Sequence, residues 1–255
     1  MKFKNERDHK MKTNWDYSER AHTYDNRAEY GFKAISDLLK KINCSSTKII
    51  ADIGAGTGKL TKHIIKTGVK VKAVEPNHYM SYYGKKNIVS NKVEWVEGTG
   101  EKTNLSDNSV DAALFGSSFN VVDQISSLKE TKRILKDGGF FACMWNHRNT
   151  NDPIQKKIEY VIKKNIPNYT YGLRREDPSE VINKSGFFDK VSKIEESFKV
   201  EMTRENMIKA WKSHDTLYRQ SGNKFDKIIY EISEIIQNNI YVIPYTTNIW
   251  YAKLN

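Results

Sequence analysis

Residues 49–60 read Ile-Ile-Ala-Asp-Ile-Gly-Ala-Gly-Thr-Gly-Lys-Leu, and this stretch decides the fold. Gly54, Gly56 and Gly58 follow a β-rich run over 48–53 and precede a helical pattern. This order is typical of an open α/β sheet that binds a nucleotide-like ligand at the turn, because glycine lets the backbone adopt positive φ and approach the ligand closely. A dinucleotide fingerprint needs a glycine at the sixth position, where this chain has Lys59. The spacing therefore disfavours a dehydrogenase.

Strand and helix patterns alternate along the rest of the first 150 residues. Strands are predicted at 48–53, 69–75, 92–97, 110–115 and 140–145. Helices are predicted at 59–67, after Pro76 with Asn77 as cap, and at 124–135. This alternation predicts a doubly wound parallel sheet. The residues 137–139, Asp-Gly-Gly, predict a turn before the fifth strand.

Two flanking regions complete the expected organisation. Apolar residues at helical spacing over 15–42 predict two helices hinged near Tyr30 and Gly31. After Trp145 the pattern predicts helices at 152–165, 178–184, about 204–214 and 224–238, with a strand-like segment at 191–200. A final strand is predicted over 241–254. The expected domains are a disordered tail (1–14), a helical lid (15–43), a core (44–150), an insertion with one core strand (151–240) and a final antiparallel strand (241–255).

Composition excludes several classes of protein. The chain has 255 residues, of which 38% are hydrophobic and 29% charged, and no apolar stretch is long enough for a membrane span. The charged first residues predict no secretory signal. Cys44 and Cys143 lie far apart without metal-ligand spacing, so we expect a cytoplasmic protein without a metal site. The net charge of +11 is spread evenly along the chain, which disfavours nucleic-acid binding and leaves a preference for anionic small substrates.

The acid and glycine spacing resembles motif I of the class I S-adenosylmethionine (SAM) methyltransferases. The order of the later motifs is also similar, with Glu-Pro-Asn-His-Tyr-Met at 75–80, Gly-Thr-Gly-Glu-Lys-Thr at 98–103 and Ile-Leu-Lys-Asp-Gly-Gly-Phe at 134–140. The resemblance covers about residues 20–145. Residues 117–123 and 243–250 resemble the small-molecule branch that includes trans-aconitate-type methyltransferases. That branch often has His and an aromatic residue where this chain has Asn120 and Val121.

The resemblance implies a SAM site on a Rossmann-like seven-stranded methyltransferase sheet, with S-adenosylhomocysteine (SAH) as product. Asp52 would organise the glycine turn and, through water, hold the methionine ammonium. Glu75, at the end of the second strand, would accept both ribose hydroxyls as charge-assisted hydrogen bonds. Met80 would lie under the adenine. The full set of expected cofactor residues is Asp52, Gly54, Gly56, Gly58, Glu75, Pro76, Met80, Thr99, Gly100, Glu101, Gly116 and Ser117.

The sequence does not require a catalytic residue, since the sulfonium already activates the methyl group and the enzyme mainly aligns the reactants. His147 and Tyr24 are the candidates if a base is used. The expected substrate-binding residues are Tyr17, Tyr24, Arg27, Asn120, Trp145, Arg148 and Arg174. Paired guanidinium donors suit a carboxylate or phosphate, and Arg175 lies beside Arg174.

We therefore expect a methyltransferase, monomeric or homodimeric, that transfers a methyl group to an O or N atom of a small anionic metabolite. Two alternatives remain open from the residues. One is an RNA or protein methyltransferase, which would favour a concentrated basic face. The other is a SAM-binding regulatory protein without catalytic activity.

Overall fold

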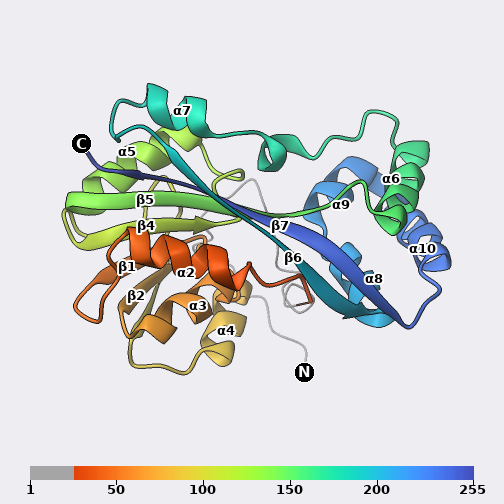
Figure 1. The fold of residues 1–255 in the computed structure, drawn as a ribbon, viewed down its shortest axis with the longest axis horizontal. Helices are drawn as coiled ribbons and strands as arrows, with labels where there is room; N and C mark the ends of the chain where they lie inside the picture. Colours follow the sequence, from red (N-terminus) through yellow and green to blue (C-terminus); the bar gives the residue numbers. More distant parts are fainter. Residues whose placement is uncertain (1–25) are drawn as a thin grey trace, which may run out of the picture.

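The computed structural model describes residues 26–255, and these contain a seven-stranded sheet (Figure 1). The strand order is β3-β2-β1-β4-β5-β7-β6. The strands are β1 (Ile49–Ile53), β2 (Lys70–Val74), β3 (Val93–Val96), β4 (Val110–Gly116), β5 (Leu135–Arg148), β6 (Ser192–Thr203) and β7 (Ile240–Lys253). Strands β1 to β5 pair in parallel, whereas β7 is antiparallel to both β5 and β6. The predicted doubly wound sheet with a final antiparallel strand is confirmed.

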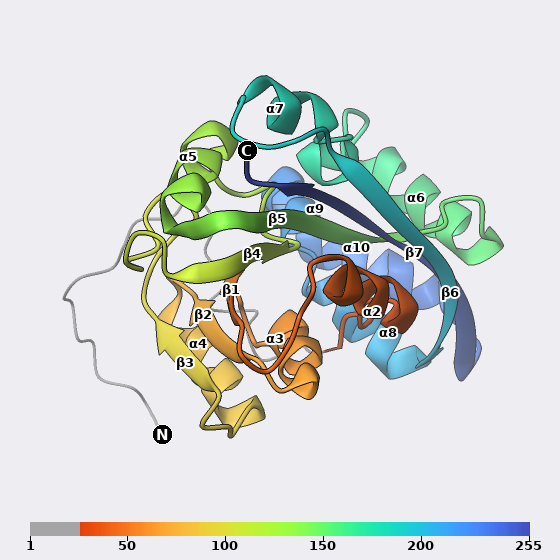
Figure 2. The ribbon, with the colours of Figure 1, turned by 60° about the vertical axis from the view of Figure 1, so that its left-hand side comes forward.

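The helices form two layers on the sheet and a group beyond its end (Figures 1 and 2). One layer contains α2 (Phe32–Lys41), α3 (Lys59–Ile64) and α4 (His78–Asn87), and the other contains α5 (Gln124–Ile134) and α7 (Ser179–Lys184). The group around the far ends of β6 and β7 consists of α6 (Pro153–Asn165), α8 (Arg204–Lys212), α9 (Asp215–Ser221) and α10 (Phe225–Ile235). Short 3-10 turns are η2 (Ile65–Thr67), η3 (Gly172–Arg175) and η4 (Gly222–Lys224).

Alternating side chains on the central strands build a core on each face of the sheet. On β4, Ala112 and Leu114 pack with α2 and α3, whereas Ala113 and Phe115 pack with α5 and α7. A third apolar cluster joins α6, α8 and α10 to β7 through residues such as Tyr245. The central strands are buried on both faces, and their carboxyl ends meet where the site lies.

Strand β5 is longer at both ends than the sequence predicts. It begins at Leu135, and residues 136–139 bulge within it, because Val110 pairs with Leu135 and Ala112 with Phe140. The predicted turn at 137–139 is therefore a bulge inside a strand, with Gly138 at φ 68°. At the other end, pairing with β7 continues as far as Arg148 opposite Tyr245. His147 and Arg148 consequently lie within β5, and not beyond the end of the strand predicted at 140–145.

Two helical predictions also need comment. The predicted helix at about 204–214 corresponds to α8, which ends at Lys212, but the sequence predicts no helix where α9 spans Asp215–Ser221. Near the N-terminus, α2 corresponds to the second of the two predicted lid helices. Most of the first lies outside the described residues.

The segment before α2 is held across the end of the sheet by side chains from distant strands. The Gly31 N–H donates to Thr247 Oγ1 at 2.7 Å, and Glu196 Oε2 accepts from the Ala34 N–H at 2.7 Å in the first turn of α2. Asn146 Nδ2 donates to the Glu29 carbonyl at 2.7 Å. Lys59 Nζ donates to the Arg27 carbonyl at 2.9 Å, and these bonds together place residues 27–31 beside the start of α3 and the end of β5.

Candidate active site

The glycine turn connects β1 to α3 in a conformation that other residues rarely adopt. Gly54, Gly56 and Gly58 have φ of 69°, 58° and 86°. A Cβ atom on Gly54 would lie 2.5 Å from Ser118 Cβ, and one on Gly58 would lie 2.4 Å from Ile88 Cδ1. Both backbone conformation and close packing therefore require glycine at these two positions.

Two buried carboxylates lie at the carboxyl ends of β1 and β2. Thr61 Oγ1 donates to Asp52 Oδ2 at 2.6 Å, while Asp52 Oδ1 has no hydrogen-bond partner within residues 26–255. The Glu75 carboxylate accepts from the Gly56 N–H and from the Asn77 N–H, each at 2.8 Å. Burial raises the pKa of Asp52 to about 6 and that of Glu75 to about 7, the latter with a contribution from the Asp52 charge. Both groups favour ligand donors that stabilise their ionised forms.

The segment after β3 is fixed against the start of α5. Glu101 Oε1 accepts from the Asp123 N–H at 2.8 Å, and Thr99 Oγ1 accepts from the Lys102 N–H at 3.1 Å. A Cβ atom on Gly100 would lie 2.8 Å from Ser127 Oγ. Met80 is buried, and its Cε would lie 3.2 Å from a Cβ on Gly56. Pro76 directly follows Glu75 and precedes the cap of α4, since Asn77 Oδ1 accepts from the Met80 N–H at 3.0 Å.

Tyr30 covers the end of β4. Its hydroxyl lies 3.0 Å from Ser117 Oγ and would lie 3.1 Å from a Cβ atom on Gly116. Ser117 has φ of 60°, and its N–H donates to the Met144 carbonyl at 2.9 Å. The end of β4 is thus joined to both β5 and the segment before α2.

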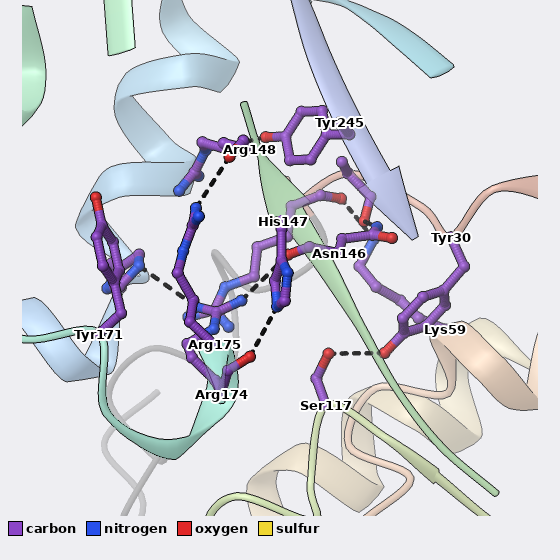
Figure 3. Close-up of a pocket in the computed structure, with 13 residues that line it drawn as sticks. Tyr30, Lys59, Ser117, Asn146, His147, Arg148, Tyr171, Arg174, Arg175 and Tyr245 are labelled. Carbon is purple, nitrogen blue, oxygen red and sulfur yellow. Dashed lines mark hydrogen bonds between the residues drawn. The ribbon is translucent and has the colours of Figure 1, made fainter. Parts of the chain in front are cut away.

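A pocket opens beside this point, and cationic side chains dominate its wall (Figure 3). Lys59 follows the glycine turn, Arg148 lies at the end of β5, Arg174 and Arg175 lie on η3, and Arg27 precedes α2. The remaining described lining residues are Ala28, Tyr30, Ser117, Asn146, His147, Tyr171, His214 and Tyr245. None of the described lining residues is an Asp or Glu. The pocket therefore has a strongly positive wall next to the glycine turn.

The central part of the chain is similar to known methyltransferases. Residues 51–143 match a family described as a methyltransferase domain. An uncharacterized methyltransferase of Mycobacterium tuberculosis is 34% identical over 123 residues, which are 48% of each chain. An uncharacterized methyltransferase-like protein of Schizosaccharomyces pombe is 26% identical over 232 residues, covering 89% of this chain and 86% of that protein.

Over residues 51–143 the chain is similar to the class I SAM-dependent methyltransferases. The crystal structure of the YcgJ protein from Bacillus subtilis shares its fold, with a TM-score of 0.57, 14% identity and coverage of 88% of this chain and 98% of that one. The chain spans about half the length of the mycobacterial relative.

The residues around the glycine turn fit SAM, the cofactor of the methyltransferases that this part of the chain resembles. The unpartnered Asp52 Oδ1 is a buried acceptor that needs a donor, and a protonated amine reached through water is such a donor. Glu75 can accept hydroxyl hydrogens on the lone pairs that its two amide contacts leave. The positive φ of the three glycines lets the backbone of the turn approach a ligand closely.

The structure places some of the expected substrate-binding residues at the pocket and others away from it. Arg27, Arg148 and Arg174 all line the pocket. Trp145 is 1% exposed in the core, and its Nε1–H donates a hydrogen bond to Asn120 Oδ1 at 2.7 Å. Neither of these two residues lines the pocket. Tyr17 and Tyr24 lie outside the described residues.

His147 lies at the pocket with both ring nitrogens engaged. Asn248 Nδ2 donates to Nδ1 at 3.3 Å, so Nε2 carries the hydrogen and donates to the Arg174 carbonyl at 2.7 Å. Burial and the nearby cations Arg174 and Arg175 lower the pKa of His147 to about 4. In this arrangement the ring is neutral and holds η3 against β5, and it has no free nitrogen to accept a proton from a substrate.

The sequence does not single out several of the residues that line the pocket. Tyr171 and His214 belong to the segment between β5 and β6 or to the helices that follow β6, and Tyr245 lies on β7. A periodic pattern reports which face of an element is apolar, but it does not report which distant elements meet. For His214 a local signal existed, since its side chain caps α9 by accepting from the Leu217 N–H at 3.3 Å.

Two searches of the described residues concern other possible sites. Between residues 26 and 255 no helix is long and apolar enough to cross a membrane. No group of three or more His, Cys, Asp or Glu residues in the same range could hold a metal ion.

Proposed function

We propose that the protein transfers the methyl group of SAM to an O or N atom of a small anionic metabolite bound in the cationic pocket. The observation that carries this proposal is the wall of the pocket, which five Lys and Arg side chains line and no described carboxylate does, although Glu29 pairs with Lys59 at 3.0 Å behind it. A cationic substrate would meet unfavourable charge there, whereas a carboxylate or phosphate would find paired guanidinium donors.

Each part of the chain has a separate task in this proposal. The glycine turn, Asp52 and Glu75 hold the cofactor, which supplies a methyl group already activated by the sulfonium. The pocket residues orient the acceptor in line with that methyl group and exclude water. Because the acceptor would lie among cations, an acidic group on it stays ionised. An oxyanion acceptor would need no general base, which agrees with the engagement of both His147 nitrogens.

We propose the same domain division as the sequence indicated, with residues 151–240 as the part that shapes the acceptor pocket. Tyr171, Arg174, Arg175 and His214 from this part line the pocket, which supports that role. Arg27, Ala28 and Tyr30 support a covering role for the segment before α2. The lid and tail predictions for residues 1–25 lie outside the described residues.

Labelled SAM incubated with pools of acidic, neutral and basic metabolites tests the function. We expect label to appear in the acidic pool, and we expect Arg148→Ala to raise KM for that acceptor at least tenfold. The matched control is Lys190→Gln, which changes an exposed cation that does not line the pocket. SAH binding without transfer to any pool would favour a regulatory protein, and transfer to neutral or basic acceptors would refute the anionic substrate.

A further inference from the structure

Strand β6 is the last strand of the sheet, beyond β7 (Figure 2). It runs over twelve residues, and within residues 26–255 it pairs with β7 alone. Natural proteins usually keep edge strands short, because a row of unpaired N–H and C=O groups is a template for pairing with another chain. The outer edge of β6 is therefore a candidate interaction surface.

Two observations show which backbone groups of β6 point away from β7. Arg204, directly after the strand, donates its N–H to the Asn239 carbonyl at 2.8 Å, so the even-numbered residues of β6 face β7. Pro244 lies opposite Lys199, but its carbonyl accepts from the Asn149 N–H at 2.9 Å on the β5 side of the strand. Lys199 therefore forms no backbone bond with β7. By alternation, the residues whose backbone groups face outward are Lys193, Glu195, Ser197, Lys199 and Glu201. No residue of the described chain is hydrogen-bonded to the outward groups of these five.

The same five side chains project from one face of β6, since side chains alternate along a strand. All five are exposed. Lys193 pairs with Glu195 along the strand at 2.9 Å, whereas Lys199 and Glu201 have no ion-pair partner in the described part of the chain. The hydroxyl of Ser197, at the centre of the row, lies 3.1 Å from that of Thr246 on β7. Two charges of opposite sign thus flank Ser197 on each side.

The order of these charges is complementary to itself about Ser197. A two-fold axis at this residue, relating two antiparallel β6 strands, would place Lys193 of one copy opposite Glu201 of the other. The same axis would place Glu195 opposite Lys199. Cross-strand pairs of opposite charge stabilise an antiparallel pair, and like charges directly opposite destabilise it. All four charges of each strand would meet an opposite charge.

Other positions of the axis lose this match. Moved one residue toward the start of β6, the axis would place Lys193 opposite Lys199. Moved one residue toward the end of the strand, it would place Glu195 opposite Glu201. Charges on an edge strand commonly prevent pairing with other chains, and here they would oppose these shifted registers. The register centred on Ser197 is favoured by charge.

We propose that two copies of this chain form a homodimer in which their β6 strands pair antiparallel about Ser197. The outward N–H and C=O groups would then bond across the two-fold axis and continue the sheet into the second copy. On the other face of the strand Ile194 would lie opposite Val200, and both are partly buried in the single chain. No described residue that lines the pocket lies on β6, so the proposal does not depend on the methyl acceptor.

Cysteine substitution tests the register. Two copies of residue 197 would form a hydrogen-bonded pair with Cα atoms about 5.5 Å apart, a separation that a disulfide spans. Two copies of residue 195 would be four residues out of register, about 14 Å apart. Cys44 is replaced by serine in both variants, and Cys143 is buried. We expect oxidised glutathione to convert Ser197→Cys to a covalent dimer and to leave the matched control Glu195→Cys monomeric on a denaturing gel. Equal cross-linking of the two variants, or none in Ser197→Cys, would contradict the register.

Sedimentation equilibrium tests the dimer and the role of its charges. We expect a wild-type dimer that dissociates on dilution. Lys199→Glu should raise the dissociation constant at least tenfold, because symmetry converts two attractions into two repulsions. Adding Glu195→Lys to that variant should restore dimerisation. The control Lys190→Glu reverses an exposed charge outside β6 and should have no effect. A wild-type protein that stays monomeric at every concentration would overturn the proposal, as would a dimer that Lys199→Glu leaves unchanged.

Ser197→Pro tests the backbone pairing. Proline is tolerated on an edge strand where the N–H faces outward, so the variant should keep the circular dichroism and the SAH affinity of the wild type. It should be monomeric, because the ring removes a central donor and obstructs the second strand. A dimer that survives this substitution would lie on another surface and would refute the pairing of β6.

Discussion

Replacing Asp52 by asparagine is expected to change stability and cofactor affinity in opposite directions. Asp52 is fully buried, one of its oxygens has no partner in the described chain, and its pKa is raised from 3.8 to about 6. Because the folded state holds the proton more tightly than the unfolded state, stability from this group is present below pH 4 and is lost as the pH rises through 6. At pH 8 the ionised carboxylate costs the folded protein about 3 kcal/mol, from about 1.4 kcal/mol for each pKa unit.

The neutral amide of the Asp52→Asn variant would avoid that cost and keep an oxygen for the Thr61 hydroxyl, which now donates to Asp52 at 2.6 Å. We expect urea unfolding of the ligand-free protein at pH 8 to show Asp52→Asn more stable than wild type by about 1–3 kcal/mol, with the difference disappearing below pH 4. Calorimetry should show SAH binding weakened by about 1.5–3 kcal/mol, the range for a hydrogen bond to a charged group. The reasoning is refuted if the variant is less stable at pH 8, or if SAH affinity is unchanged.

Three further predictions concern the turn, the second carboxylate and the segment before α2. Glu75→Ala should weaken SAH binding by about 1.5–3 kcal/mol in calorimetry, and an unchanged affinity would exclude its ribose contact. Gly54→Ala should destabilise the protein by more than about 2 kcal/mol in urea unfolding, since its Cβ would meet Ser118 at 2.5 Å. The matched control Gly172→Ala, with φ of 60° and no atom within 4 Å, should lose only about 1 kcal/mol, and equal losses would refute the packing argument. Deleting residues 1–30 should leave the circular dichroism of the sheet but abolish turnover; full activity would contradict a covering role.

The sheet could be predicted from the sequence because its signals are local. A strand, a glycine turn and a helix cap each occupy a few neighbouring residues, as the run from Ile49 to Leu60 and the Asn77 cap illustrate. The sequence indicates a turn in place of the bulge at 136–139 because Asp-Gly-Gly suits either, and only pairing with β4 distinguishes them. Helix α9 escapes prediction because its seven residues are too few to show a clear helical period.

The pocket could be predicted only in part. Arg27, Arg148 and Arg174 were selected by charge and position, and all three line it. Their partners could not be predicted, because Tyr245 reaches Arg148 through the antiparallel pairing of β5 with β7, and His214 reaches Arg174 from a separate helix. The sequence wrongly places Trp145 at the substrate, because its burial also depends on a distant strand. The pairing of β5 with β7 places its ring against Trp250, with 5.6 Å between the ring centroids.

The central claim is methyl transfer to an anionic small molecule, and initial rates on a matched pair of acceptors test it most directly. The pair is the best acidic metabolite from the labelled pools and its neutral amide, each assayed with labelled SAM in low and high salt. We predict transfer to the acid alone, with KM rising as salt increases and kcat nearly constant, because salt shortens the range of charge attraction from about 10 Å at 0.1 M to about 3 Å at 1 M. Equal rates on acid and amide, with no effect of salt, would contradict the account.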